Sequence, residues 1–594
     1  MSPSKKINAM KTIINILLLT VVCTMACNKD LLEKKPLTEY MEEDVWRDPN
    51  LVQAYVNDLY PKMRHGFNEV MLASMTDEAR FIHNYGTTTS VTEAMSPEDL
   101  GALNLFGEWD KHYKAIRNCN IFFEMVGSAK DLSAEQRKRL TGEVHFLRAY
   151  FYHMLVKYWG GVPLVKQIFK LTDGEAMLIP RNSFEECVQY IVDECDSAMA
   201  LLPEAHDRDN TGRATRFAAM ALKSRMLLYA ASDLFNRGGN TNNPEWGYVQ
   251  VDQAARTARW QKAKAAALEL MNTGAFALYK PTASAVDNYT RVFLDKNNSE
   301  IIFCKYFNKQ QLGTSHDLYN GPNGYHNWGG NVPLENFVEG YQMEDGTDFS
   351  WANPAMAAKP YEKRDPRFYA TILYNGVKWK KRPSDAVGLD PVGVIQTGRY
   401  EKRNGANIEV VNGLDTRQGP IENWNGSYTG YYLRKFMDIN LDAQFFRGDQ
   451  SWPFFRYAEI LLNYAEASME LGEEGEARTI INEVRTRGGM PALGTSVTGA
   501  ELERMYRYER RYELAFEEHR YFDARRWLIA ETVFSGPAKA IEIYGKLNPD
   551  TLLYTYKVLT NGVQERKFTR KHYLLPIMAE EIRRNSKMTP NPGY

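Results

Sequence analysis

Cysteine is scarce in this chain, and its spacing fits neither a disulfide framework nor a metal site. Six cysteines occur among 594 residues, and no two form a C-x-x-C pair. Cys187 and Cys195 stand eight residues apart on a predicted helix, which separates them by about 12 Å along its axis, too far for a disulfide. The sequence therefore argues against a disulfide-stapled scaffold and a cysteine zinc site. We expect no metal and no cofactor.

An excess of charge of one sign and long apolar runs are also missing. The 73 basic and 74 acidic side chains leave a formal net charge of −1. Nucleic-acid binding calls for a basic surface, so this balance argues against a nucleic-acid partner. After residue 26, no stretch approaches the roughly 20 uninterrupted apolar residues that a membrane span requires. We expect a chain that does not cross a membrane.

Motifs typical of common enzyme classes do not occur. The sequence has no G-x-S-x-G, no H-E-x-x-H and no P-loop, and its cysteines and histidines show no metal-ligand spacing. Its 74 acidic residues create many chance pairs of carboxylates, so counting cannot identify a glycosidase-type pair. We predict that the protein is not an enzyme and assign no catalytic residue.

The N-terminus has the pattern of a secretory signal. Three lysines precede a short apolar run at 12–22, and the small residue Ala26 follows shortly before Cys27. This order of a basic start, a short apolar run and a small residue is typical of a signal peptide. A cysteine directly after the small residue indicates lipoprotein processing, with Cys27 as the acylated lipid anchor. An ordinary cleaved signal is the alternative, Cys23 is a poorer candidate for the anchor, and Met10 is an alternative start.

Helical periodicity covers most of the chain beyond the N-terminal region. Apolar residues recur at spacings of three and four, and Ser133 with Gln136 and Ser183 with Glu186 form capping boxes. The predicted helices are 108–126, 134–158, 184–202, 215–236, 258–273, 454–471, 473–487 and 501–530. The clearest antiparallel pair, residues 456–489, resembles a tetratricopeptide unit, in which each helix pair stacks its apolar face on the next.

The middle of the chain has a different composition, which suggests a division into parts. Residues 280–450 are rich in Gly, Asn, Pro and aromatic residues, with short strand-like runs at 300–303 and 370–374. Long loops in a compact protein are usually functional, and we interpret this part as an irregular lobe inserted between the helical repeats. The predicted organisation is a signal peptide at 1–26, a lipidated cysteine and tether at 27–44, a helical-repeat part at 45–279, the variable lobe at 280–450, and a second helical-repeat part at 451–594. Residues 45–594 are expected to form one compact unit.

A series of ordered sequence blocks extends along nearly the whole chain. The blocks include DVWRDPNLVQAYVNDLYPKM (44–63), WDKHYKAIRNCNIFFEMV (109–126), GEVHFLRAYFYHMLVKYWGGVPLV (142–165), PLENFVEGYQMEDG (333–346), FRYAEILLNYAEA (455–467), ERRYELAFEEHRYFDARRW (509–527) and YLLPIMAEEIRRNSKMTPNPGY (573–594). In these blocks the chain closely resembles the SusD/RagB family of surface nutrient-binding lipoproteins. The resemblance covers the chain from the N-terminal cysteine to the C-terminus.

The resemblance implies a fold, a location and a partner. Members lie on the outer face of the outer membrane and act as a hinged lid over a SusC-like TonB-dependent transporter. They capture glycans, or peptides in the RagB branch, and pass them inward. The implied fold is mainly α, with tetratricopeptide-like helix pairs forming a right-handed superhelical scaffold beside an irregular loop-rich lobe that contains short β-strands. A peptide binder, or a mainly structural lid with little glycan affinity, is the alternative function.

Two non-helical regions offer the residue types that bind sugars. A pyranose ring presents an apolar C–H face on which aromatic rings stack, and a rim of hydroxyls that polar side chains bond. Residues 77–109 and 316–331 combine both types, and stacking aromatics in starch-binding relatives come from about the same regions. The candidate ligand-binding residues are Phe81, Tyr85, Tyr319, Asn320, Tyr325, His326 and Trp328. Trp424 and Tyr428 form a weaker third candidate, and partly buried loop anchors are the alternative interpretation.

The charged block at 509–527 has a structural interpretation. Its arginines alternate with Glu509, Glu513, Glu517 and Asp523, and several opposite charges are three or four residues apart. That spacing predicts a helix face lined with local salt bridges. The large apolar residues of 142–165 also have helical spacing and are predicted to lie in the core.

Overall fold

A computed structural model describes residues 42–237, 243–311, 313–442 and 447–594 of the protein. The predicted signal peptide, Cys23, the anchor Cys27 and nearly all of the predicted tether lie outside the described residues. Within the part that is described, no helix is both long enough and apolar enough to cross a bilayer. Cys119, Cys187, Cys195 and Cys304 are buried free thiols.

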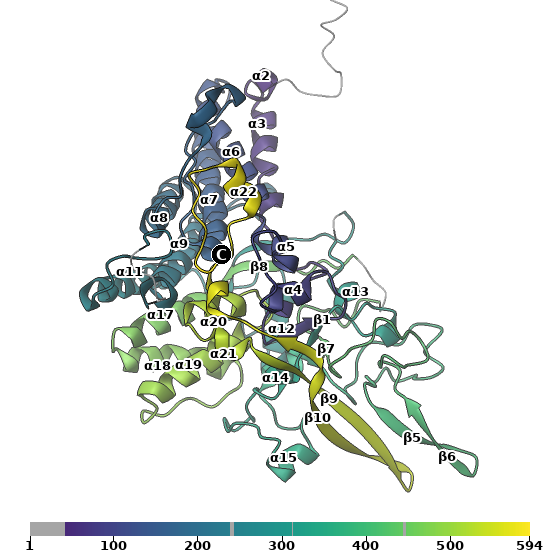
Figure 1. Ribbon diagram of the computed structural model, residues 1–594. Helices are drawn as coiled ribbons and strands as arrows, with labels where there is room; N and C mark the ends of the chain where they lie inside the picture. The colour runs from purple at the N-terminus through teal and green to yellow at the C-terminus, as the bar shows by residue number, and fades with distance from the viewer. Residues whose placement is uncertain (1–41, 238–242, 312, 443–446) are drawn as a thin grey trace, which may run out of the picture.

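Antiparallel helices form the first half of the molecule, as predicted (Figure 1). The N-terminal helices are α2 (Glu42–Val45), α3 (Pro49–Asn57), α4 (Thr87–Val91), α5 (Asn104–Gly107), α6 (Trp109–Met125), α7 (Ala134–Trp159), α8 (Phe184–Leu201), α9 (Arg216–Ala231), α10 (Asp233–Arg237) and α11 (Gln253–Met271). Each long helix packs on the next, from α6 to α11. The capping boxes predicted at Ser133 and Ser183 are present and begin α7 and α8.

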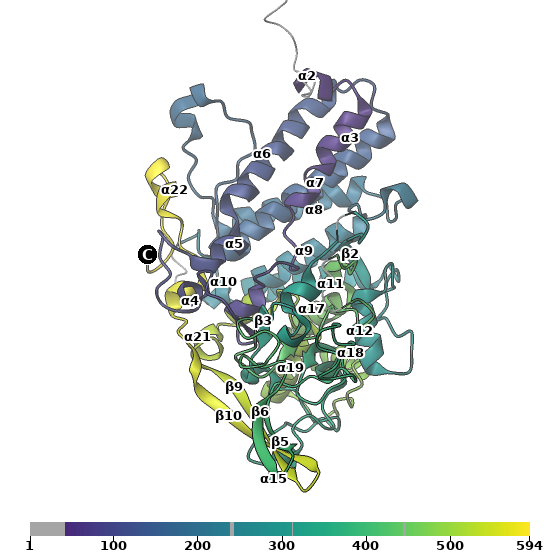
Figure 2. The same ribbon diagram turned by 90° about the vertical axis from the view of Figure 1, so that its right-hand side faces the viewer.

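The C-terminal helices continue the same array after a long insertion. They are α17 (Tyr457–Glu470), α18 (Glu474–Arg487), α19 (Gly499–Glu513), α20 (Arg520–Arg526), α21 (Ala530–Val533) and α22 (Ala579–Arg584). Helix α17 packs against both α11 and α18, so the two predicted helical-repeat parts are joined in space. In Figure 2 the irregular lobe lies in front of α17, α18 and α19.

Four predicted helices have clearly different bounds in the structure. The predicted helix 258–273 begins five residues earlier, because Asp252 caps α11 at Gln253. The predicted helix 215–236 is interrupted at Ser232, between α9 and α10. The predicted helix 454–471 begins only at Tyr457, because the preceding residues form strand β8. The prediction of one helix over 501–530 is wrong. Helix α19 ends at Glu513, and the chain turns through Phe516 and Glu518, whose φ angles of 60° and 65° are incompatible with a right-handed helix.

The lobe between the helical parts is irregular, as predicted, and contains short elements. Its helices are α12 (Ala285–Leu294), α13 (His316–Asn320), α14 (Glu335–Val338), α15 (Pro354–Ala358) and α16 (Pro366–Thr371). Its strands are β2 (Ile301–Lys305), β3 (Asn331–Pro333), β4 (Ile372–Leu373), β5 (Arg399–Asn404), β6 (Asn407–Asn412) and β7 (Tyr432–Leu433). Strand β2 confirms the first predicted run and pairs with β8 (Trp452–Arg456). The second is confirmed only in part: Ala370 and Thr371 belong to α16, whereas Ile372 and Leu373 form β4, which pairs with β7.

A long hairpin in the C-terminal part departs from the predicted helical repeat. Strands β9 (Gly536–Asn548) and β10 (Thr551–Arg566) pair with each other, and with β5 and β6 they form a four-stranded sheet in the order β10-β9-β5-β6. The sheet projects away from the helices (Figure 1). In the sequence of β9, Ala538 and Ala540 flank Lys539, and Ile541 and Ile543 flank Glu542, with a change of phase between 540 and 541. This period of two is that of a strand.

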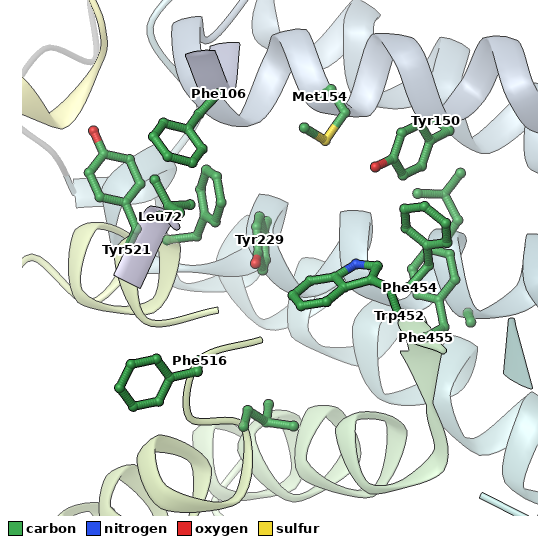
Figure 3. Close-up of a cluster of buried hydrophobic side chains, with 14 of the residues drawn as sticks. Leu72, Phe106, Tyr150, Met154, Tyr229, Trp452, Phe454, Phe455, Phe516 and Tyr521 are labelled. Carbon is green, nitrogen blue, oxygen red and sulfur yellow. The ribbon is translucent and has the colours of Figure 1, made fainter. Parts of the chain in front are cut away.

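One apolar core extends through the helical parts and the lobe. Tyr150 of α7, Tyr229 of α9, Trp452 and Phe454 of β8, and Phe516 belong to the same buried cluster (Figure 3). Residues from segments more than 300 positions apart therefore exclude water from a shared interior. That arrangement agrees with the prediction of one compact unit, which itself stays a prediction.

The charged block at 509–527 is buried and does not form a solvated helix face. Glu513 bonds Arg456 at 2.7 Å and also pairs with Arg487, while Arg520 bonds Asp77 at 2.8 Å. Only Arg526 and Asp523 form a pair with helical spacing, at 2.8 Å. The prediction of local salt bridges is therefore wrong apart from this pair, because the charged groups of the block are buried and most of them pair with residues far away in the sequence.

Candidate functional site

Pairing of two short strands brings the two predicted ligand regions together. Strand β1 (Ala79–Phe81) runs antiparallel to β3, with Phe81 opposite Asn331. The backbone N–H of Ile82 donates to the carbonyl of Gly330 at 2.9 Å. A Cβ on Gly330 would lie 3.3 Å from the ring of Phe81. Residues 77–85 and 316–331 are therefore neighbours, although some 240 residues separate them in the sequence.

The weaker third candidate region joins them. Gly329 has a φ of +55°, and a Cβ there would come within 2.4 Å of the carbonyl oxygen of Asn425. The side chain of Asn323 donates to the carbonyl of Thr416 at 2.9 Å. These contacts place the loop that carries Trp424 directly against the loop that carries Trp328.

Four exposed aromatic side chains come from these three adjoining segments. The exposed fractions are 53% for Tyr85, 36% for Trp328, 59% for Trp424 and 36% for Tyr428. We call Tyr85, Trp328, Trp424 and Tyr428 the aromatic surface. Exposed aromatic rings leave apolar area in contact with water, and a group of them marks a binding site more often than a structural need.

Side chains of the same segments pack against three of these rings. The ring of His83 lies 5.8 Å from that of Trp424 and 6.0 Å from that of Tyr85, tilted by 36° and 32°. The ring of Tyr319, which is half-buried, lies 5.3 Å from that of Trp328. Each distance is within the range of favourable aromatic contact, so the rings have defined orientations.

Two guanidinium groups fix the fourth ring. The Cζ atoms of Arg80 and Arg417 lie 3.8 Å and 3.9 Å from the centre of the Tyr428 ring. Arg417 also donates to the carbonyl of Gly426 at 2.9 Å. Such cation–π contacts stabilise the ring and place hydrogen-bond donors beside it. Sequence reasoning named Arg80 only as part of a region and did not single out Arg417, whose role depends on the fold.

Five of the seven predicted ligand residues do not belong to the aromatic surface, and one of the five, Tyr319, packs against the ring of Trp328. Phe81, Asn320 and Tyr325 are in the interior, where Tyr325 donates to the carbonyl of Lys380 at 3.0 Å and Asn320 accepts from the N–H of Asn331 at 3.1 Å. These residues are the loop anchors of the alternative interpretation. Burial also raises the pKa of Tyr325 above its ordinary value, so its hydroxyl stays protonated.

His326 faces a separate cavity. Its Nε2 lies 2.9 Å from a carboxylate oxygen of Asp385, and the ring is half-buried. The cavity beside it has a volume of about 980 Å³ and is lined by polar residues that include Lys381 and Asp442. Of the predicted residues, the structure therefore gathers Tyr85, Tyr319 and Trp328 near one surface, together with Trp424 and Tyr428.

Comparison with known proteins places the chain in a family. Residues 299–594 match the model described as the SusD family, and residues 30–228 match one described as starch-binding, associating with the outer membrane. The chain belongs to the SusD/RagB family. The two matches together cover residues 30–228 and 299–594, which include most of both helical-repeat parts and most of the lobe.

Curated relatives and solved structures agree with this assignment. SusD-like protein P25 of Formosa agariphila is 22% identical, with 84% of this chain and 86% of that protein aligned. The crystal structure of a SusD-like protein from Bacteroides fragilis is 28% identical, with a TM-score of 0.74 over 94% of this chain and all of the other. A SusD-like carbohydrate-binding protein from the same species is 24% identical, with a TM-score of 0.70 over 92% of this chain and all of that chain. These likenesses support the mainly helical fold.

Proposed function

We propose that the protein is a lipid-anchored, cell-surface glycan-binding protein. It binds an oligosaccharide or polysaccharide at the aromatic surface and delivers it to a SusC-like TonB-dependent transporter in the outer membrane. The observation that carries the proposal is the aromatic surface itself, where exposed, oriented rings stand beside arginine donors. Such rings stack on the C–H face of a sugar, and the arginines bond its hydroxyls. The family description as starch-binding supports this ligand class.

Calorimetric titration of the chain that begins after Cys27 tests the glycan part. A panel of polysaccharides, oligosaccharides and peptides should give saturable binding for one glycan class. Trp424→Ala and Trp328→Ala should each weaken that binding several-fold, because a stacking contact contributes about 1 kcal/mol. Tyr554→Ala is the matched control: its ring is 37% exposed but lies on the projecting hairpin. Binding to peptides alone, or to nothing in the panel, would contradict the glycan proposal.

The anchor and the partner need tests in the cell envelope. Cys27→Ser should abolish incorporation of labelled fatty acid and release the protein from the outer-membrane fraction. Affinity purification of the wild-type protein from detergent-solubilised outer membrane should recover a TonB-dependent transporter. A purified protein without such a partner, at normal expression, would argue against the delivery role.

A further inference from the structure

Two adjoining cavities lie away from the aromatic surface, where the segment after α3 meets the start of α6 and the end of β2. The first, about 360 Å³, is lined mainly by basic residues, and we call it the basic cavity. The second, about 380 Å³, is lined by apolar residues that include Phe303 and Phe454 and also by Asp209 and Arg213, and we call it the apolar cavity. Pro61, Met63 and Lys305 line both, so the two cavities adjoin, and we call them together the groove.

The basic cavity contains cations without counterions. Arg64, Lys114 and Lys305 line it, and none makes an ion pair or a side-chain hydrogen bond with any residue that the structure describes. The one carboxylate among its described lining residues is that of Glu108, which Lys111 already pairs at 2.5 Å. The groove therefore has an unbalanced positive charge.

The position of Arg64 increases the free-energy cost of this unbalanced charge. Its guanidinium packs 4.2 Å from the centre of the Phe106 ring, and its Nε and Nη2 are buried with no acceptor among the described residues. Burial, together with the charges of Lys305 and Arg64, lowers the pKa of neighbouring His65 to about 3, so this ring adds no further charge. Glu518 interacts with Arg64 electrostatically but forms no ion pair with it. The remainder of the half-buried Arg64 side chain lines the cavity, so its charge adds to those of Lys114 and Lys305.

The apolar cavity defines the other half of the ligand. Phe303 and Phe454 form part of its wall, with rings stacked 5.4 Å apart, and Met63 lies at the boundary with the basic cavity. Lys305 stands between the two halves. A ligand that fills the groove must combine a negative group with an apolar group a short distance away.

We propose that this groove binds an acidic peptide segment of a partner protein. Its Asp or Glu carboxylate lies against Arg64, Lys114 and Lys305, and an adjacent large apolar side chain enters the apolar cavity. A sugar or a free oxyanion fits less well, because it has no separate apolar group for the Phe303 and Phe454 wall. None of the lining residues belongs to the aromatic surface, so the two sites are independent.

Fluorescence anisotropy with labelled peptides tests the proposal. The probes are ten-residue peptides in which Asp-Glu precedes or follows Phe, and the protein is the full chain that begins after Cys27. At least one probe should bind saturably and more weakly at high salt, because the contact is electrostatic. Lys114→Ala and Lys305→Ala should each weaken binding about tenfold, as expected for loss of a charge-assisted hydrogen bond.

Matched controls separate the groove from general surface charge. Arg117 is exposed on the same helix as Lys114 but does not line the groove, so Arg117→Ala should leave the affinity unchanged. Replacing Asp-Glu by Asn-Gln, or Phe by Ser, should abolish probe binding. Circular dichroism and glycan binding should stay normal in every variant.

Three results would overturn the proposal. The first is that no acidic probe binds saturably. The second is that Arg117→Ala and Lys114→Ala weaken the affinity for the peptide equally. The third is that inorganic phosphate or a sulfated oligosaccharide binds more tightly than the peptides. Because glycan binding at the aromatic surface is measured on the same samples, failure of this proposal is distinguishable from failure of the proposed function.

Discussion

Arg456 is the centre of a buried network of charges at the junction between the lobe and the helical repeats. Its guanidinium donates to Glu300 and Glu513 at 2.7 Å and to Glu517 at 2.6 Å. Burial alone would lower the pKa of the guanidinium, but these carboxylates outweigh that effect and hold its pKa well above the usual range. The arginine is therefore always charged and satisfied on several sides.

Removal of Arg456 should strongly destabilise the protein. In Arg456→Ala, the carboxylates of Glu300, Glu513 and Glu517 would lose a buried counterion, which costs about 3–5 kcal/mol. Urea unfolding followed by tryptophan fluorescence measures the free energy of unfolding. Arg504→Ala, which removes an exposed pair with Glu501 at 2.8 Å, should cost at most about 1 kcal/mol. If Arg456→Ala and Arg504→Ala lowered the free energy of unfolding equally, the buried network would be no more stabilising than an exposed ion pair.

Glu78 gives a residue-scale prediction for neutral and alkaline pH. Burial, with a contribution from the charge of Asp77, raises the pKa of its carboxyl to about 8, above the ordinary 4.5. The folded state thus binds this proton more tightly than the unfolded state. The associated stability is complete below the ordinary pKa and is lost as the pH rises through about 8. In Glu78→Gln, the melting temperature should fall less than in the wild type between pH of about 6 and 9. If the melting temperatures of the wild type and of Glu78→Gln changed equally with pH, the raised pKa of Glu78 would be excluded.

The contact between β1 and the 316–331 loop positions the aromatic surface. Gly330 is required there because a Cβ would lie 2.6 Å from the carbonyl oxygen of Tyr319. Gly330→Ala should push this loop away from Phe81 and cost about 1–3 kcal/mol by overpacking. It should also weaken glycan binding, measured by the same titration. Gly127→Ala, where a Cβ meets nothing within 4 Å, should change neither quantity. Unaltered glycan affinity in Gly330→Ala would show that the loop position does not matter.

At the scale of elements, the sequence predicts what local patterns determine. The start of α7 follows from Ser133 and Gln136, because a capping box satisfies backbone donors within four residues. The hairpin β9–β10 was not predicted, because the helical repeat was expected to continue through residues 451–594. The apolar residues on either side of Lys539 and Glu542 nevertheless have the spacing of a strand. The break after Glu513 was missed because apolar spacing continues across a turn that backbone angles alone reveal.

The candidate site shows the same limit. Tyr325 and Trp328 lie three residues apart in one glycine-rich loop, and no local property of the sequence distinguishes the buried ring from the exposed one. The hydroxyl of Tyr325 bonds the distant Lys380, whereas the ring of Trp328 packs only against Tyr319 of the same loop among the ring contacts that the described residues make. The regions were therefore predictable from composition, whereas the choice of residues within them required the fold.

The whole molecule is held together by ion pairs between parts that are distant in the sequence. Asp77, which precedes β1, pairs with Arg511 and Arg520 of the C-terminal part, each at 2.8 Å. Glu466 of α17 pairs with Arg526 of α20 at 2.5 Å. Burial alone would raise the pKa values of both carboxyls, but their arginines outweigh it and lower each pKa to about 2.

Acid should therefore weaken the N-terminal and C-terminal helical-repeat parts together. A carboxyl with a lowered folded pKa contributes stability that is complete above its ordinary value, 3.8 for Asp77 and 4.5 for Glu466, and is lost as the pH falls toward about 2. Urea unfolding at pH values from about 6 down to about 3 should show a falling midpoint in one cooperative step. Asp77→Asn should lower the midpoint at pH of about 6 and flatten its pH dependence, whereas Glu135→Gln, at an exposed position on α7, should do neither. Two separate transitions at low pH would mean that the parts unfold independently and that these pairs do not couple them.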